Sequence, residues 1–255
     1  MPIVDSHGVP IHYEVAGDGA PIVLVHGFAS SLQGNWGRTG WIDLLRAQGR
    51  QVVGLDCRGH GSSGKPHDSA AYDGHAMPED VVAVMDAAGV GRADLMGYSM
   101  GGWISLNLLS RHPDRFRSAI IGGAGLRTAA AEPTRRNRLA EAMEAADPST
   151  ISDPIAAAFR RFAERNNNDL QALAALQRAT RAPADEAALR SVQLPVLVVV
   201  GDADDALDGA RRLADLVPDA ELVTLASENH LSAVIAQGYK GAVGRFLERS
   251  SPVAA

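Results

Sequence analysis

The chain is short of features that would each point to a particular class of protein. Cys57 is the only cysteine among 255 residues, so no internal disulfide and no cysteine-based zinc site can form. The formal net charge is −6, whereas nucleic-acid-binding proteins normally carry a basic excess. We therefore expect no nucleic-acid partner, and we predict neither a metal nor another cofactor.

Long apolar runs are also missing. The longest aliphatic run, PVLVVVG at 195–201, is far shorter than the roughly 20 residues that a membrane-spanning helix needs. The start of the chain, MPIVDSHGVPIHYEV, has neither the basic region nor the apolar stretch of a signal peptide. We expect a soluble, cytoplasmic protein that binds no membrane, and the sequence is compatible with a monomer or a homo-oligomer.

The sequence is rich in short β-branched runs, each closed by Gly or Asp. Several are apolar throughout, which is typical of strands covered on both faces by helices. The first run alternates instead, as an edge or antiparallel strand does. The predicted strands are 11–17, 21–27, 51–56, 93–99, 118–124, 195–202 and 221–227.

Helical patterns separate these runs, most clearly at 78–89, 101–113 and 229–248. Strands that alternate with helices predict an α/β fold with a mostly parallel central sheet flanked by helices.

One stretch, 127–190, breaks the alternation, because it is rich in Ala and Arg and contains no strand-like run. We predict helices at 134–146, 154–165 and 169–181. The stretch is then a helical cap inserted into a core made of 1–126 and 191–255. The alternative is a set of packing helices with no gating role.

The segment GHGSSGKP at 59–66 matches two phosphate-binding patterns, G-x-G-x-x-G and G-x-x-x-x-G-K. The second pattern needs a hydroxyl residue after the lysine, but Pro66 follows Lys65 and pushes it out of helical geometry. The first needs a helix that opens among the glycines, and no helical pattern begins before about Pro78. We therefore reject nucleotide binding at this loop.

The segment GYSMGG at 97–102 carries the stronger chemical signal. It reads G-x-S-x-G with an apolar strand before it and a helical run after it, which is the context of a nucleophile elbow. Its glycines allow a tight turn that leaves the Ser99 hydroxyl exposed above the sheet. The alternative is a glycine-rich turn with an incidental serine.

A serine nucleophile needs a base, and the base needs an orienting acid. Of the eight histidines, only His230 follows the last predicted strand, so we predict it as the base. The run PVLVVVGDADD ends with three aspartates, of which we choose Asp204, with Asp205 second. The order Ser99, Asp204, His230 is the Ser…Asp…His order of α/β-hydrolases.

Acyl transfer also needs donors for an oxyanion. One is expected from the backbone N–H of Met100, which follows the nucleophile. The other is expected from Phe28 in VHGFAS, at the end of an earlier strand. We expect His26 to brace this loop through hydrogen bonds.

Together these segments resemble the α/β-hydrolase superfamily over nearly the whole chain. LVHGFA is similar to its oxyanion loop, LDCRGHGSSGKP to the loop after the next strand, GYSMGG to the elbow, GDAD to the acid loop and NHLSA to the histidine loop. The resemblance implies a serine esterase-like fold with a helical cap. It also implies that Asp56, Arg58 and His60 tie down a structural turn. The histidine loop departs from the pattern by reading S-E-N-H rather than G-x-G-H.

Three functions remain open. The first is a cofactor-free carboxylesterase that acts on small-molecule esters or lactones. The second is an enol-lactonase or a hydrolase of carbon–carbon bonds in ring-fission products, with cap arginines at 135, 136, 160 and 161 attracting a carboxylate. The third is a receptor that keeps the triad only as part of a ligand pocket. The pocket candidates are Trp36, Met143, Phe159 and Phe162, each of which is also a candidate for the core.

Overall fold

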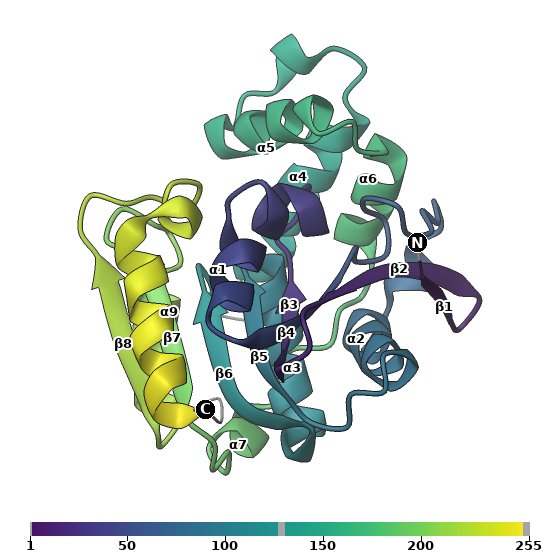
Figure 1. The fold of residues 1–255 in the computed structure, drawn as a ribbon. Helices are drawn as coiled ribbons and strands as arrows, with labels where there is room; N and C mark the ends of the chain where they lie inside the picture. Colours follow the sequence, from purple (N-terminus) through teal and green to yellow (C-terminus); the bar gives the residue numbers. More distant parts are fainter. Residues whose placement is uncertain (1, 127–130, 252–255) are drawn as a thin grey trace.

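The computed structural model describes residues 2–126 and 131–251. Within them, eight strands form one sheet in the order β1-β2-β4-β3-β5-β6-β7-β8 (Figure 1). The strands are β1 (Ile3–Ser6), β2 (Val9–Ala16), β3 (Ala20–Val25), β4 (Arg50–Leu55), β5 (Ala93–Tyr98), β6 (Phe116–Gly122), β7 (Val196–Gly201) and β8 (Ala220–Leu225).

Strands β3 to β8 pair in parallel, whereas β2 runs antiparallel to both β1 and β4. This confirms the predicted mostly parallel sheet and the antiparallel character of the alternating run.

Helices cover both faces of the sheet. They are α1 (Trp41–Ala47), α2 (Ala76–Ala87), α3 (Met100–Arg111), α8 (Leu207–Leu216) and α9 (Gln237–Ser250). Alternation along β3 divides the core, because Val23 and Val25 belong to one buried cluster and Ile22 and Leu24 to the other. The two clusters explain why the strands are apolar at every position.

Among the described residues between β6 and β7, every named element is a helix, and these helices lie in two places. Helices α4 (Ala131–Glu144), α5 (Pro154–Arg165) and α6 (Leu170–Arg178) form a layer at the top of Figure 1. Helix α7 (Glu186–Leu189) lies at the other end and packs against α3. The start of the predicted cap, 127–130, lies outside the described residues, and the proposed domain division stays a prediction.

Local chemistry explains where the cap helices begin. Asp153 accepts hydrogen bonds from the N–H groups of Ile155 and Ala156, and Pro154 occupies the first helical position. Asp169 caps α6 through the N–H of Ala172. Such caps satisfy donors that a helix end would leave unpaired.

The last helix begins later than the sequence pattern predicts, at Gln237 rather than at 229. The side chain of Asn229 accepts hydrogen bonds from the N–H groups of Leu231 and Ser232, which forms a turn instead. His230 therefore lies in a loop at the end of β8 and not on a helix.

Candidate active site

Ser99 lies between β5 and α3 in a backbone conformation that side chains rarely adopt, with φ 56° and ψ −111°. Its N–H donates to the Gly122 carbonyl oxygen at 2.8 Å. The neighbouring glycines make this turn possible, since a Cβ on Gly101 would collide with the Val25 carbonyl and a Cβ on Gly97 with that of Gly101. The strained turn is thus held by strands on both sides.

The structure brings the three predicted triad side chains together. His230 Nε2 lies 2.8 Å from Ser99 Oγ, and His230 Nδ1 lies 2.8 Å from Asp204 Oδ2. With the proton on Nδ1, the ring donates to Asp204 and accepts from the serine hydroxyl. This is the geometry in which an imidazole can take a proton from a serine.

Asp204 is suited to orient a histidine. Its side chain is fully buried and accepts a further hydrogen bond from the Ala206 N–H at 2.9 Å. Burial by itself would raise the pKa of the Asp204 carboxyl, but the hydrogen bond and charge attraction from His230 outweigh it and lower that pKa. The carboxylate therefore stays charged beside the imidazole.

Asp205, the second candidate for the acid, faces the cap. Its side chain is 45% exposed, and its Oδ2 lies 3.9 Å from Arg135 Nε on α4. Its carboxylate also comes within 4.8 Å of ligand atoms of both Asp204 and His230, but the direct hydrogen bond to the imidazole comes from Asp204.

The loop of His230 is also bound to the strand that carries Ser99. The Tyr98 hydroxyl donates to the His230 carbonyl oxygen at 2.7 Å. Burial raises the pKa of this phenol, so it remains a donor. This contact fixes the backbone of the base without using its ring.

The two predicted oxyanion donors flank Ser99. Phe28, Ser99 and Met100 line the same cavity, and within the described residues neither the Phe28 N–H nor the Met100 N–H donates a hydrogen bond. Met100 opens α3, so the positive end of the helix dipole lies there. Both N–H groups therefore lack a hydrogen-bond acceptor among the described residues.

The Phe28 loop is shaped by the histidines that the sequence analysis assigned to structure. His60 Nε2 accepts from the Ala29 N–H at 3.1 Å, and His26 Nε2 accepts from the Cys57 N–H at 2.9 Å. Burial lowers the pKa of His26 and lowers that of His60 to about 3. Both rings are therefore neutral and can accept these hydrogen bonds.

The glycine-rich loop at 59–66 has a structural role. Asp56 accepts from the Leu32 and Ser62 N–H groups and pairs with the His12 ring, and Arg58 pairs with Asp80. After the loop the chain forms a short 3-10 turn at Ser69–Tyr72 and reaches its next α-helix only at Ala76. This arrangement lacks the helix start that a phosphate loop requires.

Ser99 opens into a cavity of about 310 Å³ whose wall includes residues of α3, α4, α5 and α6. Phe159, one of the four predicted pocket residues, lines it.

The other three pocket residues lie elsewhere, which corrects the prediction at those positions. Trp36 is fully buried on the opposite face of the sheet, packed edge-on against Trp41. Met143, on α4, is buried in the cluster that joins the cap helices to the core, and Phe162 packs against that cluster. Apolar character did not distinguish a cavity wall from the core.

The sequence reasoning missed Trp103, Gln177 and Arg181, which all line the cavity. Trp103 lies four residues after Ser99 on the helix that follows, so helical periodicity carried a signal for it. Of the cap arginines considered, Arg135 and Arg136 line the cavity. Arg160 instead holds the carbonyl oxygens of Ala142 and Ala145, and Arg161 is exposed.

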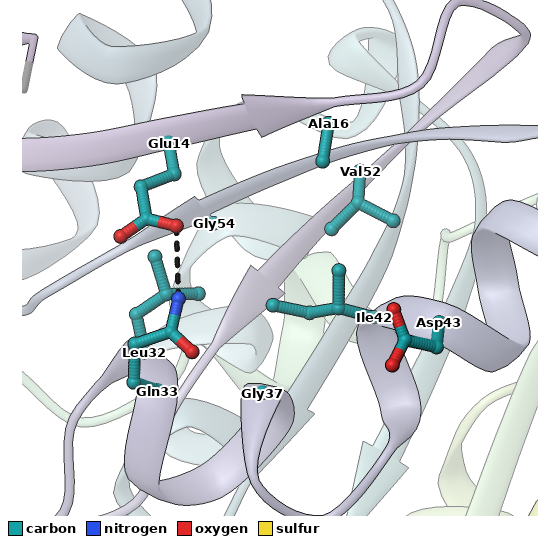
Figure 2. A pocket seen from close by; sticks show the side chains of 9 residues that line it. All are labelled: Glu14, Ala16, Leu32, Gln33, Gly37, Ile42, Asp43, Val52 and Gly54. Carbon is teal, nitrogen blue, oxygen red and sulfur yellow. Dashed lines mark hydrogen bonds between the residues drawn. The ribbon is translucent and has the colours of Figure 1, made fainter.

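A second cavity, of about 250 Å³, lies between β2, β4 and α1. Figure 2 shows its wall, where Gln33 Nε2 donates to Glu14 Oε2 at 2.9 Å. Its lining includes Asp43 and the apolar Ile42 and Val52, but none of the triad residues. The triad residues therefore belong to the cavity at Ser99 and not to this one.

None of the helices among the described residues combines the length and the apolarity that crossing a membrane would require.

Known proteins are similar to this chain in sequence. The dihydrolipoyllysine-residue acetyltransferase component of the acetoin cleaving system of Pseudomonas putida is 32% identical over 237 residues, which cover 86% of this chain and 61% of that protein. The 2-hydroxymuconate semialdehyde hydrolase of Pseudomonas sp. (strain CF600) is 33% identical over 120 residues, 47% of this chain and 42% of that protein. The matched segments thus span less than two thirds of either relative.

An esterase from Rhodococcus sp. ECU1013 is similar in structure, with a TM-score of 0.78, 26% identity and coverage of 98% of both chains. The model of the alpha/beta hydrolase fold family matches residues 20–165, which include the oxyanion loop and the elbow. The chain therefore belongs to the alpha/beta hydrolase family, and its relatives indicate a hydrolase.

Proposed function

We propose that this protein is a serine hydrolase that cleaves carboxylic esters or lactones of small molecules. The observation that carries the proposal is the continuous hydrogen-bonded path from Ser99 Oγ through His230 to Asp204, at 2.8 Å in each step. The path ends in a cavity beside two backbone donors. The similarity to a solved esterase supports the same reaction class.

The first half-reaction forms the acyl-enzyme on Ser99. Ser99 Oγ bonds to the carbonyl carbon of the ester while His230 Nε2 takes the hydroxyl proton. The N–H groups of Phe28 and Met100 hold the resulting oxyanion, and each such donor typically contributes about 2.7–4 kcal/mol in the transition state. His230 then gives its proton to the leaving alkoxide, which departs as the alcohol.

The second half-reaction uses the same groups in reverse. His230 Nε2 takes a proton from water as the water oxygen bonds to the acyl carbon. The tetrahedral intermediate collapses, its bond to Ser99 Oγ breaks, and His230 returns the proton to that oxygen. Asp204 stabilises the imidazolium in both halves. The products are the free acid and the unchanged enzyme, with no cofactor in the sequence of steps.

Active-site labelling tests the proposal. A fluorophosphonate probe is expected to label the wild-type protein and the Ser62→Ala variant, whose exposed serine serves as a matched control. It is expected not to label Ser99→Ala. Equal labelling of Ser99→Ala and wild type would refute the assignment of the nucleophile.

Activity on p-nitrophenyl esters of increasing acyl length then separates an enzyme from a receptor. We expect Asp204→Asn to lower kcat by about 10⁴, as in other triads, and Asp205→Asn to lower it far less. A wild-type protein that reacts with neither probe nor ester would favour the receptor function.

A second candidate function keeps the same triad and changes the bond. Arg135 and Arg136 line the cavity, and a relative matched over part of the chain is a 2-hydroxymuconate semialdehyde hydrolase. Both observations favour cleavage of a carbon–carbon bond or an enol lactone in an acidic substrate. Comparing kcat/KM for a ring-fission acid, an enol lactone and a short acyl ester on one preparation decides between the two candidates.

A further inference from the structure

The side chain of Gln177 is an unexplained polar group in the cavity of Ser99. It lies near the end of α6, is only 4% exposed and lines the cavity. Its Oε1 makes no hydrogen bond to any described residue. Buried amides are almost always paired, because leaving one unpaired is costly. An unpaired amide on a cavity wall therefore indicates a missing hydrogen-bonding partner.

The same wall is rich in positive charge. Arg135, Arg136 and Arg181 line it, and Glu186 is the only acidic residue among the described residues that do. Each guanidinium carries five N–H donors in a planar fork that matches a carboxylate. One guanidinium can therefore donate hydrogen bonds to a protein acceptor and to a ligand at the same time.

The arginines nearest Gln177 are held in place by the cap. Arg136 donates to the backbone carbonyl oxygens of Gln177 and Ala179. The guanidinium of Arg181 lies 5.2 Å from the ring centre of Trp103, and it donates to the Leu176 carbonyl at 3.2 Å. These contacts hold Arg136, from α4, and Arg181, which follows α6, against the end of α6 where Gln177 lies.

The remainder of the cavity is mostly apolar and small. Trp103, Leu106, Leu139 and Phe159 contribute to its wall. A volume of about 310 Å³ lies at the lower end of the range for small-molecule pockets. The cavity thus fits a short apolar chain that ends in one polar group.

We infer that Gln177, Arg136 and Arg181 bind a carboxylate on the substrate, so that the enzyme prefers esters or lactones bearing a second, ionised carboxyl group. The carboxylate accepts hydrogen bonds from the guanidinium groups and from the amide of Gln177, whose two ends exchange places by rotation about the terminal bond. The inference rests on the proposed function, because it assigns the substrate class of the same site.

Two matched pairs of esters test this inference. The p-nitrophenyl monoester of adipic acid differs from p-nitrophenyl hexanoate by a carboxylate in place of the terminal methyl group of the acyl chain. The second pair, 4-acetoxybenzoate and phenyl acetate, carries the carboxylate on the leaving group. The ratio of kcat/KM within a pair is measured for wild type, Gln177→Leu and Arg181→Met, so that intrinsic reactivity cancels between proteins.

We expect each variant to lower the ratio of charged to neutral ester by about tenfold or more in at least one pair, as the loss of a hydrogen bond to a charged group does. Gln171→Leu is the control on the same helix, since Gln171 is exposed, and it should leave both ratios unchanged. Unchanged ratios in both variants with both pairs would overturn the inference. Melting temperatures show whether each variant is folded.

A binding measurement separates this inference from the proposed function. Monomethyl adipate and methyl hexanoate are titrated calorimetrically into Ser99→Ala and into the double variant Ser99→Ala, Gln177→Leu. Tighter binding of monomethyl adipate that is lost in the double variant supports the carboxylate site even if the wild type hydrolyses no ester. Equal affinity for the two compounds counts against the site, whatever the outcome of the labelling experiment.

Discussion

Two glycine-rich turns, one after β4 and one after β5, have similar sequences but different roles. The turn after β4 contains Asp56, Arg58 and His60, and each of these side chains is used in hydrogen bonds to the protein. The turn after β5 contains Ser99, whose hydroxyl is hydrogen-bonded to the ring of His230 and which lines a cavity.

The contrast shows that glycine spacing alone does not identify a functional loop. In both turns, glycines allow the backbone to approach another chain segment closely. Gly61 leaves space for the Asp56 carboxylate, and Gly101 leaves space for the Val25 carbonyl. What differs is whether the polar atoms nearby are already paired. Satisfied groups stabilise a fold, and unsatisfied groups at a cavity are available for chemistry.

The largest expected effect is at the second turn. Ser99→Gly should lower kcat by 10⁴ or more, because the proposed nucleophile is lost. It should also raise the melting temperature, because glycine adopts φ 56° without the strain of a side chain, which is worth on the order of 1 kcal/mol. Ester hydrolysis and thermal unfolding are measured on the same preparation.

The matched control is Ser99→Ala, which removes the hydroxyl but keeps the Cβ. It should lose activity equally without the gain in melting temperature. A melting temperature of Ser99→Gly below that of Ser99→Ala would contradict the assignment of backbone strain to this turn.

At the first turn we expect a loss of stability. Asp56→Ala leaves the buried Leu32 N–H and the buried His12 ring without their partner, at a cost of about 1–3 kcal/mol each. The total of roughly 3 kcal/mol corresponds to a melting temperature lower by about 10 °C in a chain of this size. Asp18→Ala, at an exposed position, should change it by less than about 2 °C, and similar losses in both variants would show that Asp56 is not a structural anchor.

The histidines of the first turn predict a pH dependence of stability. The pKa of His60 is lowered by burial to about 3, from an ordinary value of 6.5. The unfolded chain therefore takes up a proton below pH 6.5 that the folded chain does not bind. Stability is full above that pH and falls as the pH decreases toward 3, by up to about 1.4 kcal/mol per pH unit for this group.

Urea unfolding at pH 7.5 and pH 5 measures this effect. His60→Gln keeps a hydrogen-bond acceptor for the Ala29 N–H but does not titrate in this range, so its loss of stability between the two pH values should be smaller than that of wild type. The same loss in both proteins would mean that His60 is not the group responsible.

The smallest expected effect concerns the lysine that suggested a phosphate loop. Lys65 Nζ donates to the carbonyl oxygens of Gly61 and Ser63 at the surface of the turn. Lys65→Met should change the free energy of unfolding by less than about 0.5 kcal/mol. Calorimetry with ATP is expected to detect no binding to either protein, and binding that the substitution abolishes would restore the nucleotide hypothesis.

Much of this architecture could be predicted from the sequence because it depends on local patterns. The apolar run of β7 alternates between the two core clusters, with Val198 facing one and Val199 the other, and such runs are recognisable without coordinates. Ser99, Asp204 and His230 each follow a predicted strand. This predicts that they lie at one edge of the sheet, since loops at the carboxyl ends of parallel strands meet there.

Other features depend on contacts between distant segments. The ring of Trp36 packs against Trp41 on the face of the sheet opposite the cavity. The residues around Trp36 in the sequence do not indicate which of the two places it takes. Gln177 and Arg181 become cavity residues only because α6 packs beside α4. Helix α8 was not predicted, although its Leu213 and Leu216 lie at helical spacing and could have indicated it.

The hydrogen bond from Tyr98 to the backbone of His230 has a consequence for how the molecule admits its substrate. Nucleophile and base are joined through neighbours in the central sheet, whereas the far wall of the cavity belongs to helices inserted in another part of the chain. That hydrogen bond involves no residue of those helices, so substitutions in them that change which substrate fits leave this anchor of the His230 backbone in place.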